Sequence, residues 1–115
     1  MAIEGIWTGE VYGPFGWENR GVFILEGGRL LGGDNRQTTV GRYRFSGRDM
    51  TAELTIHYYG PPRTVFGEAA ETFMSIIEGA LDAEGGVIDG TIRRPDKPQY
   101  ELQLRLTKRM ELPNA

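Results

Sequence analysis

Alternation of apolar and polar side chains, with a period of two residues, is the feature that most constrains how this 115-residue chain folds. From Met50 to Tyr58 the even positions are apolar and the odd positions are polar, and the segment from Tyr100 to Leu106 repeats the pattern. Successive side chains of a β-strand point to opposite faces, so each segment is expected to form a strand with one buried face and one solvated face. Such strands are typical of antiparallel sheets.

Further short segments of the same kind are separated by turns that contain glycine or proline. The other expected strands are residues 3–11, 21–25, 30–31, 38–45 and 87–93. The expected turns include residues 26–29, 46–49 and 95–98. About eight short strands would leave exposed edges unless the sheet closed on itself. We therefore predict a single all-β domain over residues 1–115: an eight-stranded, antiparallel, up-and-down barrel.

Residues 66–81 fit two structures. Phe66, Ala69, Phe73 and Ile77 follow a helical spacing, and the segment contains good helix formers. A strand over residues 72–77 is equally compatible with Gly79 and with the regular spacing of the turns. We favour the strand, because its absence would leave a gap in the sheet.

The composition excludes several classes of protein. The net charge of −3 has the wrong sign for a surface that binds a phosphate backbone, so direct binding to nucleic acid is not expected. The absence of cysteine excludes disulfides and thiolate chemistry and fits a reducing compartment. No apolar stretch approaches the length of a membrane span, and the first residues do not resemble a secretion signal. These observations predict a cytoplasmic protein that does not bind membranes.

The residues offer little for catalysis or for cofactors. The only histidine, His57, falls on the polar side of its strand, and neither Ser46 nor Ser75 lies in a nucleophile motif. One histidine is too few for the usual zinc or iron sites, and the acids of residues 82–89 lack the spacing of a calcium loop. No Gly-x-Gly or Gly-Lys-Ser/Thr sequence occurs for binding a nucleotide. We therefore expect no enzyme activity, no metal and no cofactor.

Arginine residues recur along the expected strands. Arginine can hold an anion or an acidic partner, but in alternating strands it usually solvates the outside of a sheet. We expect the outside position for Arg42, Arg44, Arg93, Arg94, Arg105 and Arg109.

Alternation places a set of aromatic side chains inside the expected barrel. An eight-stranded wall encloses a space that side chains can fill or that can hold one small ligand. Packing is the favoured interpretation, and a pocket for a small apolar ligand is the alternative. The residues concerned are Trp7, Phe23, Tyr43, Phe45 and Tyr58.

An ordered series of short motifs runs along nearly the whole chain. The motifs are Gly5-x-Trp7, Gly21-Val22, Gly27-Gly28, Leu30-Leu31-Gly32-Gly33-Asp34, Gly41-x-Tyr43, Phe66-Gly67, Gly90-x-Ile92 and Glu111-Leu112-Pro113. In this order they resemble the GrlR-like family of negative regulators of type III secretion. The resemblance implies a lipocalin-like barrel, a homodimer, and action by binding a regulatory protein. It also implies that a late basic residue, Arg105 or Lys108, packs on the Trp7 ring.

The same resemblance implies a recognition element in the turn at residues 46–49. Of the acids that the family carries in this turn, only Asp49 has a counterpart here, and Arg48 reverses the charge. Asp34 is expected to play a structural part by accepting backbone N–H bonds in its own turn. Our first hypothesis is a non-enzymatic, homodimeric regulator that binds another protein. The alternative is a carrier or sensor of a small hydrophobic ligand.

Overall fold

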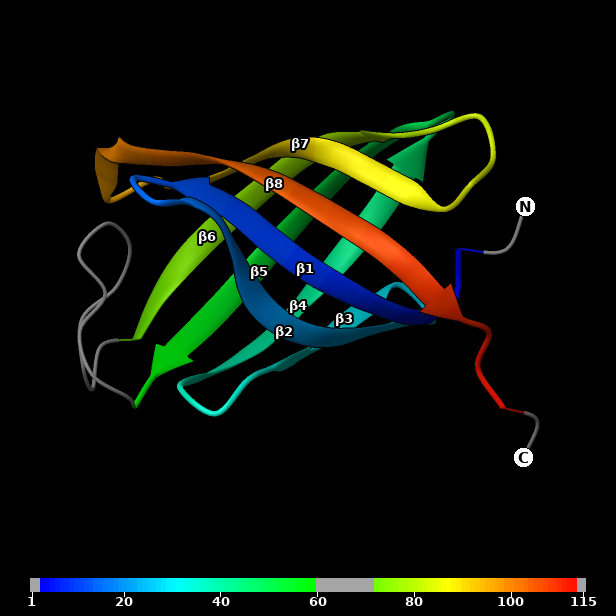
Figure 1. Cartoon of the computed structure of the whole chain (residues 1–115), viewed down its shortest axis with the longest axis horizontal. Helices are drawn as coiled ribbons and strands as arrows, with labels where there is room; N and C mark the ends of the chain where they lie inside the picture. Colours follow the sequence, from blue (N-terminus) through cyan, green and yellow to red (C-terminus); the bar gives the residue numbers. More distant parts are fainter. Residues whose placement is uncertain (1–2, 60–71, 114–115) are drawn as a thin grey trace.

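The computed structural model describes residues 3–59 and 72–113, which form eight β-strands and no helix (Figure 1). In chain order the strands are β1 (Gly5–Gly13), β2 (Gly16–Glu26), β3 (Arg29–Gly33), β4 (Gln37–Ser46), β5 (Asp49–Tyr58), β6 (Thr72–Leu81), β7 (Val87–Arg94) and β8 (Lys97–Met110). Each strand pairs antiparallel with the next along the chain. The prediction of an all-β fold is confirmed.

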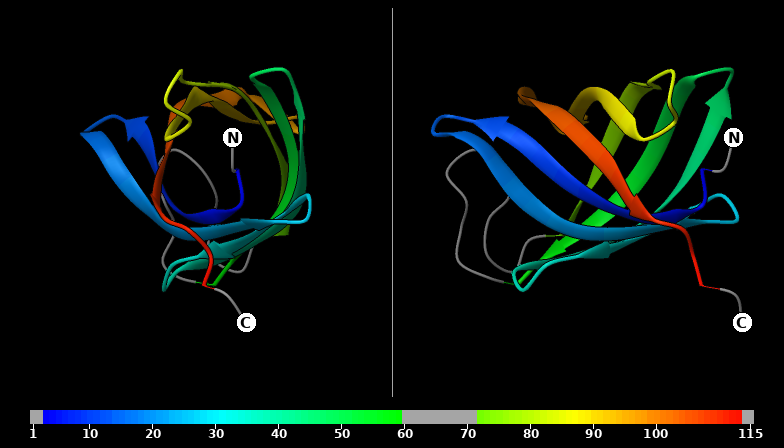
Figure 2. Two further views of the ribbon diagram at one scale, coloured as in Figure 1. Left: turned by 90° about the vertical axis from the view of Figure 1, so that its right-hand side faces the viewer. Right: turned by 45° about the vertical axis from the view of Figure 1, so that its right-hand side comes forward.

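Pairing between β1 and β8 closes the sheet into a barrel. This seam runs from the Ile6–Met110 pair to the Tyr12–Gln103 pair, so each of the eight strands pairs with two neighbours over part of its length. Figure 2 shows the strands running at a steep tilt around the barrel. The eight-stranded antiparallel barrel expected from alternation is therefore the observed architecture, consistent with a lipocalin-like barrel.

Strand β6 settles the ambiguous segment in favour of a strand. Its register fixes it between β5 and β7, with Ile77 paired to Ala52 on one side and to Ile92 on the other. Phe73, Ser75 and Ile77 are buried, whereas Met74 and Glu78 are exposed. The pairing energy and this alternation outweigh the local preference for a helix. Residues 66–71 of the segment lie outside the described residues.

The observed strand ends differ from the expected ones. Strand β1 begins two residues later than expected and continues to Gly13, and β2 begins at Gly16. The last turn is shorter than residues 95–98, because β8 begins at Lys97. Backbone pairing continues past the point at which side chains stop alternating, which is why a pattern of apolar residues underestimates strand length.

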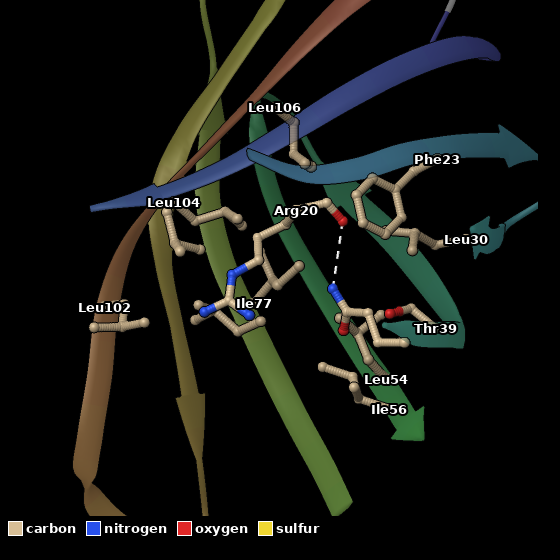
Figure 3. A pocket seen from close by; sticks show the side chains of 13 residues that line it. Arg20, Phe23, Leu30, Thr39, Leu54, Ile56, Ile77, Leu102, Leu104 and Leu106 are labelled. Atoms are coloured by element: carbon tan, nitrogen blue, oxygen red, sulfur yellow. Dashed lines mark hydrogen bonds between the residues drawn. The ribbon is translucent and has the colours of Figure 1, made fainter. Parts of the chain in front are cut away.

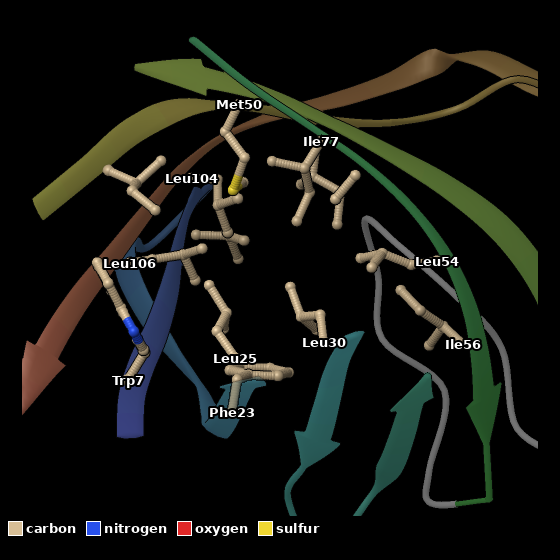
Figure 4. Close-up of a cluster of buried hydrophobic side chains, with 14 of the residues drawn as sticks. Trp7, Phe23, Leu25, Leu30, Met50, Leu54, Ile56, Ile77, Leu104 and Leu106 are labelled. Carbon is tan, nitrogen blue, oxygen red and sulfur yellow. The ribbon is translucent and has the colours of Figure 1, made fainter. Parts of the chain in front are cut away.

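Apolar side chains from strands around the wall point into the barrel and form its core (Figure 4). Trp7 and Leu25 are completely buried, and Met50 is 1% exposed. The Trp7 Nε1–H donates to the carbonyl oxygen of Ile3 at 3.0 Å, so the residues before β1 cover the end of the barrel where β1 begins. The completely or nearly completely buried apolar residues are Trp7, Val11, Phe23, Leu25, Leu30, Met50, Ala52, Leu54, Ile56, Tyr58, Phe73, Ile77, Leu81, Ile88, Ile92, Leu104 and Leu106.

Aspartate side chains fix two of the turns. Asp34 Oδ1 accepts the backbone N–H groups of Arg36 at 2.8 Å and Gln37 at 3.1 Å, which confirms its expected structural part. Gly33, just before it, has a φ of 142°. Any side chain there would meet the Gln37 carbonyl oxygen, 2.2 Å from an ideal Cβ. Glycine is therefore required where β3 turns into β4.

Asp82 plays the corresponding part between β6 and β7, and it makes this turn sensitive to acid. Backbone N–H bonds from Val87 (3.1 Å) and Gly86 (2.9 Å) hold the pKa of the Asp82 carboxyl below its ordinary value of 3.8, and Arg48 lowers it further. A lowered folded-state pKa means that the charged form stabilises the fold above pH 3.8. This stabilisation is lost as the pH falls through the lower folded-state pKa.

We therefore expect Asp82→Asn to flatten the acid limb of a plot of unfolding free energy against pH. Carbon-13 NMR titration of the Asp82 carboxyl should give a pKa below 3.8 in the folded protein. A normal pKa, or an unchanged acid limb in the variant, would contradict the account of the turn.

Candidate functional site

The aromatic residues expected inside the barrel divide into two groups. Trp7, Phe23 and Tyr58 are buried in the core. Tyr43 and Phe45 are only partly buried and pack edge to face against each other at the end where β1 begins, with ring centroids 5.9 Å apart. Burial raises the pKa of the Tyr43 hydroxyl. All five contribute to the packing of the interior, as the favoured interpretation requires.

A small cavity of about 40 Å³ remains in the interior (Figure 3). Ten apolar side chains and three polar ones line it: Val11, Arg20, Phe23, Leu30, Gln37, Thr39, Leu54, Ile56, Ile77, Ile92, Leu102, Leu104 and Leu106. A water molecule needs about 10–15 Å³ on this scale, so the cavity has room for about three water-sized groups. Among the five expected aromatic residues, Phe23 is the one in its lining.

Arg20 is the lining residue that alternation failed to identify. The β1–β2 register shifts between Gly9, which pairs with Gly21, and Glu10, which pairs with Asn19. The bulge inserts Arg20 as an extra residue in the register and turns its side chain inward, where 7% of the residue is exposed. Gly21 lies at this point with a φ of 109°. A glycine in the strand is therefore the feature of the sequence that marks the bulge.

Neighbours on β4 and β5 hold the backbone and the side chain of Arg20, respectively. Its Nη1–H donates to the Tyr58 hydroxyl. The Gln37 amide Nε2–H donates to the Arg20 carbonyl oxygen at 3.3 Å, as Figure 3 shows. The guanidinium group of Arg20 thus lies among leucine and isoleucine side chains. Hydrogen bonds fix both the backbone carbonyl oxygen of Arg20 and its Nη1.

Arg94 is also inside the barrel, which shows that the expected outside position was wrong for this residue. It is 1% exposed, and its guanidinium carbon lies 3.9 Å from the centre of the Phe73 ring. Its Nη2 lies 2.8 Å from the Asp96 carboxylate, and this contact lowers the pKa of Asp96. Arg94 lies on the same side of β7 as the buried Ile88 and Ile92, and it was missed because the expected strand ended at residue 93.

The outside of the barrel carries an apolar face across four neighbouring strands. Ile24 on β2 is paired with Ile6 on β1 and with Leu31 on β3, and Leu31 is paired with Val40 on β4. Val22 lies two residues from Ile24 on the same side of β2. Val40, Val22 and Ile24 are 57%, 50% and 38% exposed. We call these five residues the outer apolar face.

Charges of both signs border the outer apolar face. The next row of outward positions carries Glu26, Arg29, Arg42 and Glu53, each on the strand beside the last. Arg29 and Glu26 form an exposed ion pair at 3.8 Å. Arg42 and Arg44 are exposed on the outside, as expected for alternating arginines.

The expected recognition turn lies between β4 and β5, and Arg48 and Asp49 are both exposed there. The Arg48 carbonyl oxygen accepts the Leu81 N–H at 2.8 Å, so the turn is fixed against the end of β6. A role in binding a partner stays a prediction.

The basic residues expected near Trp7 occupy different places. Arg105 points outward, pairs with Asp89 at 2.8 Å and stacks over the Trp17 ring at 4.8 Å, which corrects the expectation for this residue. Lys108 is the cross-strand neighbour of Trp7 in the β1–β8 seam.

The residues considered for catalysis do not come together. His57 is exposed, and its Nδ1 lies 2.6 Å from the Thr72 hydroxyl. Ser75 is completely buried on the opposite side of the wall, and Ser46 is exposed at the far end of β4. Within residues 3–59 and 72–113, no group of three or more His, Asp or Glu side chains is arranged to hold a metal ion. The same residues contain no helix suited to spanning a membrane.

These features define a small, closed, antiparallel barrel with a polar residue buried in its cavity and an apolar face on its wall. No protein-family model matches the chain, and no curated protein matches it.

Proposed function

We propose that the protein is a non-enzymatic regulator that acts as a homodimer by binding another protein. The outer apolar face carries this proposal, because three of its five side chains are well exposed on a continuous part of the wall. The resemblance to the GrlR-like family favours the same function. The turn with Arg48 and Asp49 is the proposed contact with the regulatory partner, and the absence of cysteine fits the proposed cytoplasmic location.

Closure of the barrel decides how a partner can bind. A sheet with an exposed edge can accept another strand, but every strand here pairs with two neighbours over part of its length. We therefore place the association of two copies on side chains of the wall. Apolar side chains supply most of the free energy of such contacts, and the outer apolar face presents Ile24 at its centre, between Ile6 and Leu31.

A second copy of the chain is the occupant that we assign to this face. The bordering row of Glu26, Arg29, Arg42 and Glu53 carries two charges of each sign, so a second copy is not repelled. A standard interface takes about 800 Å² from each partner. The surface of the chain is 6531 Å², so such an interface would occupy roughly an eighth of it.

Replacing Ile24 by lysine should separate the two subunits. A charge placed at the centre of an apolar interface has to lose its hydration without gaining a partner. We expect the dissociation constant of the dimer to rise at least about 100-fold. Sedimentation velocity over a range of protein concentrations measures this directly.

Gln103→Lys is the matched control, because Gln103 is exposed on β8, away from the outer apolar face. This variant should dimerise like the unchanged protein. If the unchanged protein sediments as a monomer at all accessible concentrations, the homodimer is disproved. If both lysine variants remain dimeric, the interface lies elsewhere on the wall.

A further inference from the structure

The outer side of the hairpin formed by β4 and β5 carries a groove with two arginine side chains. Its volume is about 280 Å³, and it is lined by Gly28, Arg42, Tyr43, Arg44, Thr51 and Glu53. We propose that this groove binds an extended acidic segment of the regulatory partner, with carboxylates at alternate positions on Arg42 and Arg44. The inference rests on the proposed function, because it names the chemistry of the partner that the regulator binds.

The two guanidinium groups of the groove are not engaged by acids of the protein itself. Four other arginines on the strands form ion pairs: Arg29, Arg93, Arg94 and Arg105. In the part of the chain that the structure describes, Arg42 and Arg44 are exposed and form no ion pair. A guanidinium group presents parallel N–H donors that match the two oxygens of a carboxylate. Both arginines are therefore available to an acidic ligand from outside.

Glu53 is the acid that lies beside these arginines. It is opposite Arg42 in the β4–β5 register, and among the described residues it has no ion-pair partner. The lining of the groove thus carries two positive charges and one negative charge, whereas the whole chain has a net charge of −3. An acidic ligand is attracted to the groove and repelled by the protein as a whole. This contrast favours one specific site over general binding of anions.

The spacing of the arginines favours an extended ligand. Arg42 and Arg44 are separated by one residue of β4, so their Cα atoms lie about 7 Å apart along the strand. Tyr43, between them, packs against the core instead of standing between the two guanidinium groups. Alternate side chains of an extended peptide lie on one face with the same spacing. Two glutamates separated by one residue can therefore each reach one arginine.

The sides of the groove suit the approach of a peptide backbone. Gly28, in the turn between β2 and β3, contributes no side chain. Its carbonyl oxygen accepts the Tyr43 N–H at 2.8 Å, so the turn is fixed beside β4. On the opposite side, Thr51 supplies a hydroxyl that can donate to a carboxylate. The groove is thus built on paired strands, and little conformational freedom of the protein is lost when a peptide binds.

The groove adjoins the two surfaces already assigned to partners. Val40, which belongs to the outer apolar face, lies two residues before Arg42 on the same side of β4. The turn with Arg48 and Asp49 joins β4 to β5 at the other end of the groove. A regulatory partner that contacts this turn therefore lies next to Arg44.

The test is a titration of the nitrogen-15-labelled full chain with a synthetic peptide, followed by NMR at constant ionic strength. The peptide is capped at both ends and contains threonines and two glutamates separated by one residue. We expect saturable shifts of the backbone N–H groups of Arg42, Arg44 and Thr51. An isomer with adjacent glutamates directs them to opposite sides of an extended chain, so it should bind about threefold more weakly. Replacing both glutamates by glutamine should abolish the shifts.

Variants of the protein locate the peptide. Arg42→Gln and Arg44→Gln should each raise the dissociation constant about three- to fivefold, because each loses one exposed ion pair. Arg36→Gln is the matched control, since it removes the same charge from an exposed residue between β3 and β4. It should change the dissociation constant less than about 1.5-fold, because salt screens exposed charges that are not in contact.

Glu53→Gln tests the charge of the groove in the opposite direction. Without the acid opposite Arg42, the peptide should bind at least about twofold more tightly. Glu84→Gln makes the same change in net charge in the turn between β6 and β7, where Glu84 is exposed, and should leave the binding unchanged. Glu53 is exposed as well, so circular dichroism should show a folded barrel in both variants.

The proposal is overturned if the peptide causes no saturable shift up to about 5 mM, or if the isomer with adjacent glutamates binds equally well. Equal weakening by Arg36→Gln and Arg44→Gln would show an effect of net charge and would also overturn it. Tighter binding of a short single-stranded oligothymidylate would assign the arginines to phosphate groups instead. Sedimentation tests the homodimer separately, so failure of the peptide and failure of the homodimer are distinguishable.

Discussion

Replacing Trp7 by alanine is expected to lower the free energy of unfolding by about 3–5 kcal/mol. The Trp7 ring is completely buried, and its Nε1–H holds the residues before β1 through the Ile3 carbonyl oxygen. The variant loses the buried area of the ring and leaves a space that neighbours such as Leu25 cannot fill. Urea denaturation followed by far-ultraviolet circular dichroism measures the change.

Trp17→Ala is the matched control, since the chain contains two tryptophans. Trp17 is 40% exposed on the outside of β2, where it contacts Tyr12 and Arg105. Its loss should cost less than about 1.5 kcal/mol. Equal losses in the two variants would show that Trp7 does not anchor the core.

Gly90→Ala should be the second most damaging of these changes, at about 2–3 kcal/mol. Gly90 lies on β7 opposite Gly79 of β6. A Cβ at residue 90 would lie 2.0 Å from the Glu78 carbonyl oxygen and 2.5 Å from the Gly79 Cα. Both obstacles are backbone, so the β6–β7 pair has to separate. Thermal and urea unfolding measure the loss.

Gly86→Ala, in the turn that leads into the same strand, provides the comparison. No atom lies within 4 Å of a Cβ built at Gly86, so this change should alter the stability by less than about 0.5 kcal/mol. A large effect at Gly86 or a negligible one at Gly90 would contradict the close approach of β6 and β7.

The barrel itself was predictable because its signals are local. Alternation from Met50 to Tyr58 indicates a strand whatever its partners are, and Gly27 and Gly28, with φ of 60° and 80°, mark a tight turn between two strands. Closure follows from the number of strands and from the need to protect their edges. Residues 72–81 were harder, since their helical and extended patterns coincide and the contacts with β5 and β7 decide between them.

The cavity and its charge could not be predicted in this way. A single bulge exchanges the inward and outward sides for every residue before it on β2. The Arg20 side chain therefore points inward, whereas Phe23, after the bulge, stays on its expected inner side. Arg94 faces inward at the end of β7, where an ion pair with Asp96 and the Phe73 ring compensate for its burial. The position of Arg20 depends on the register between β1 and β2, which local alternation does not show.

The outer apolar face was missed for a different reason. Residues 21–25 are apolar without interruption, which identifies a strand but does not distinguish its two faces. The partners of Ile24 become apparent only when the register places Ile6 and Leu31 beside it.

The seam between β1 and β8 has a consequence during protein synthesis. Ile6 and Met110 are separated by almost the whole chain, so the ribosome has to release nearly all of it before the barrel can close. Until then the nascent chain presents two open edges to other nascent chains. Truncated products that end before β8 should therefore depend on chaperones more strongly than the finished chain does.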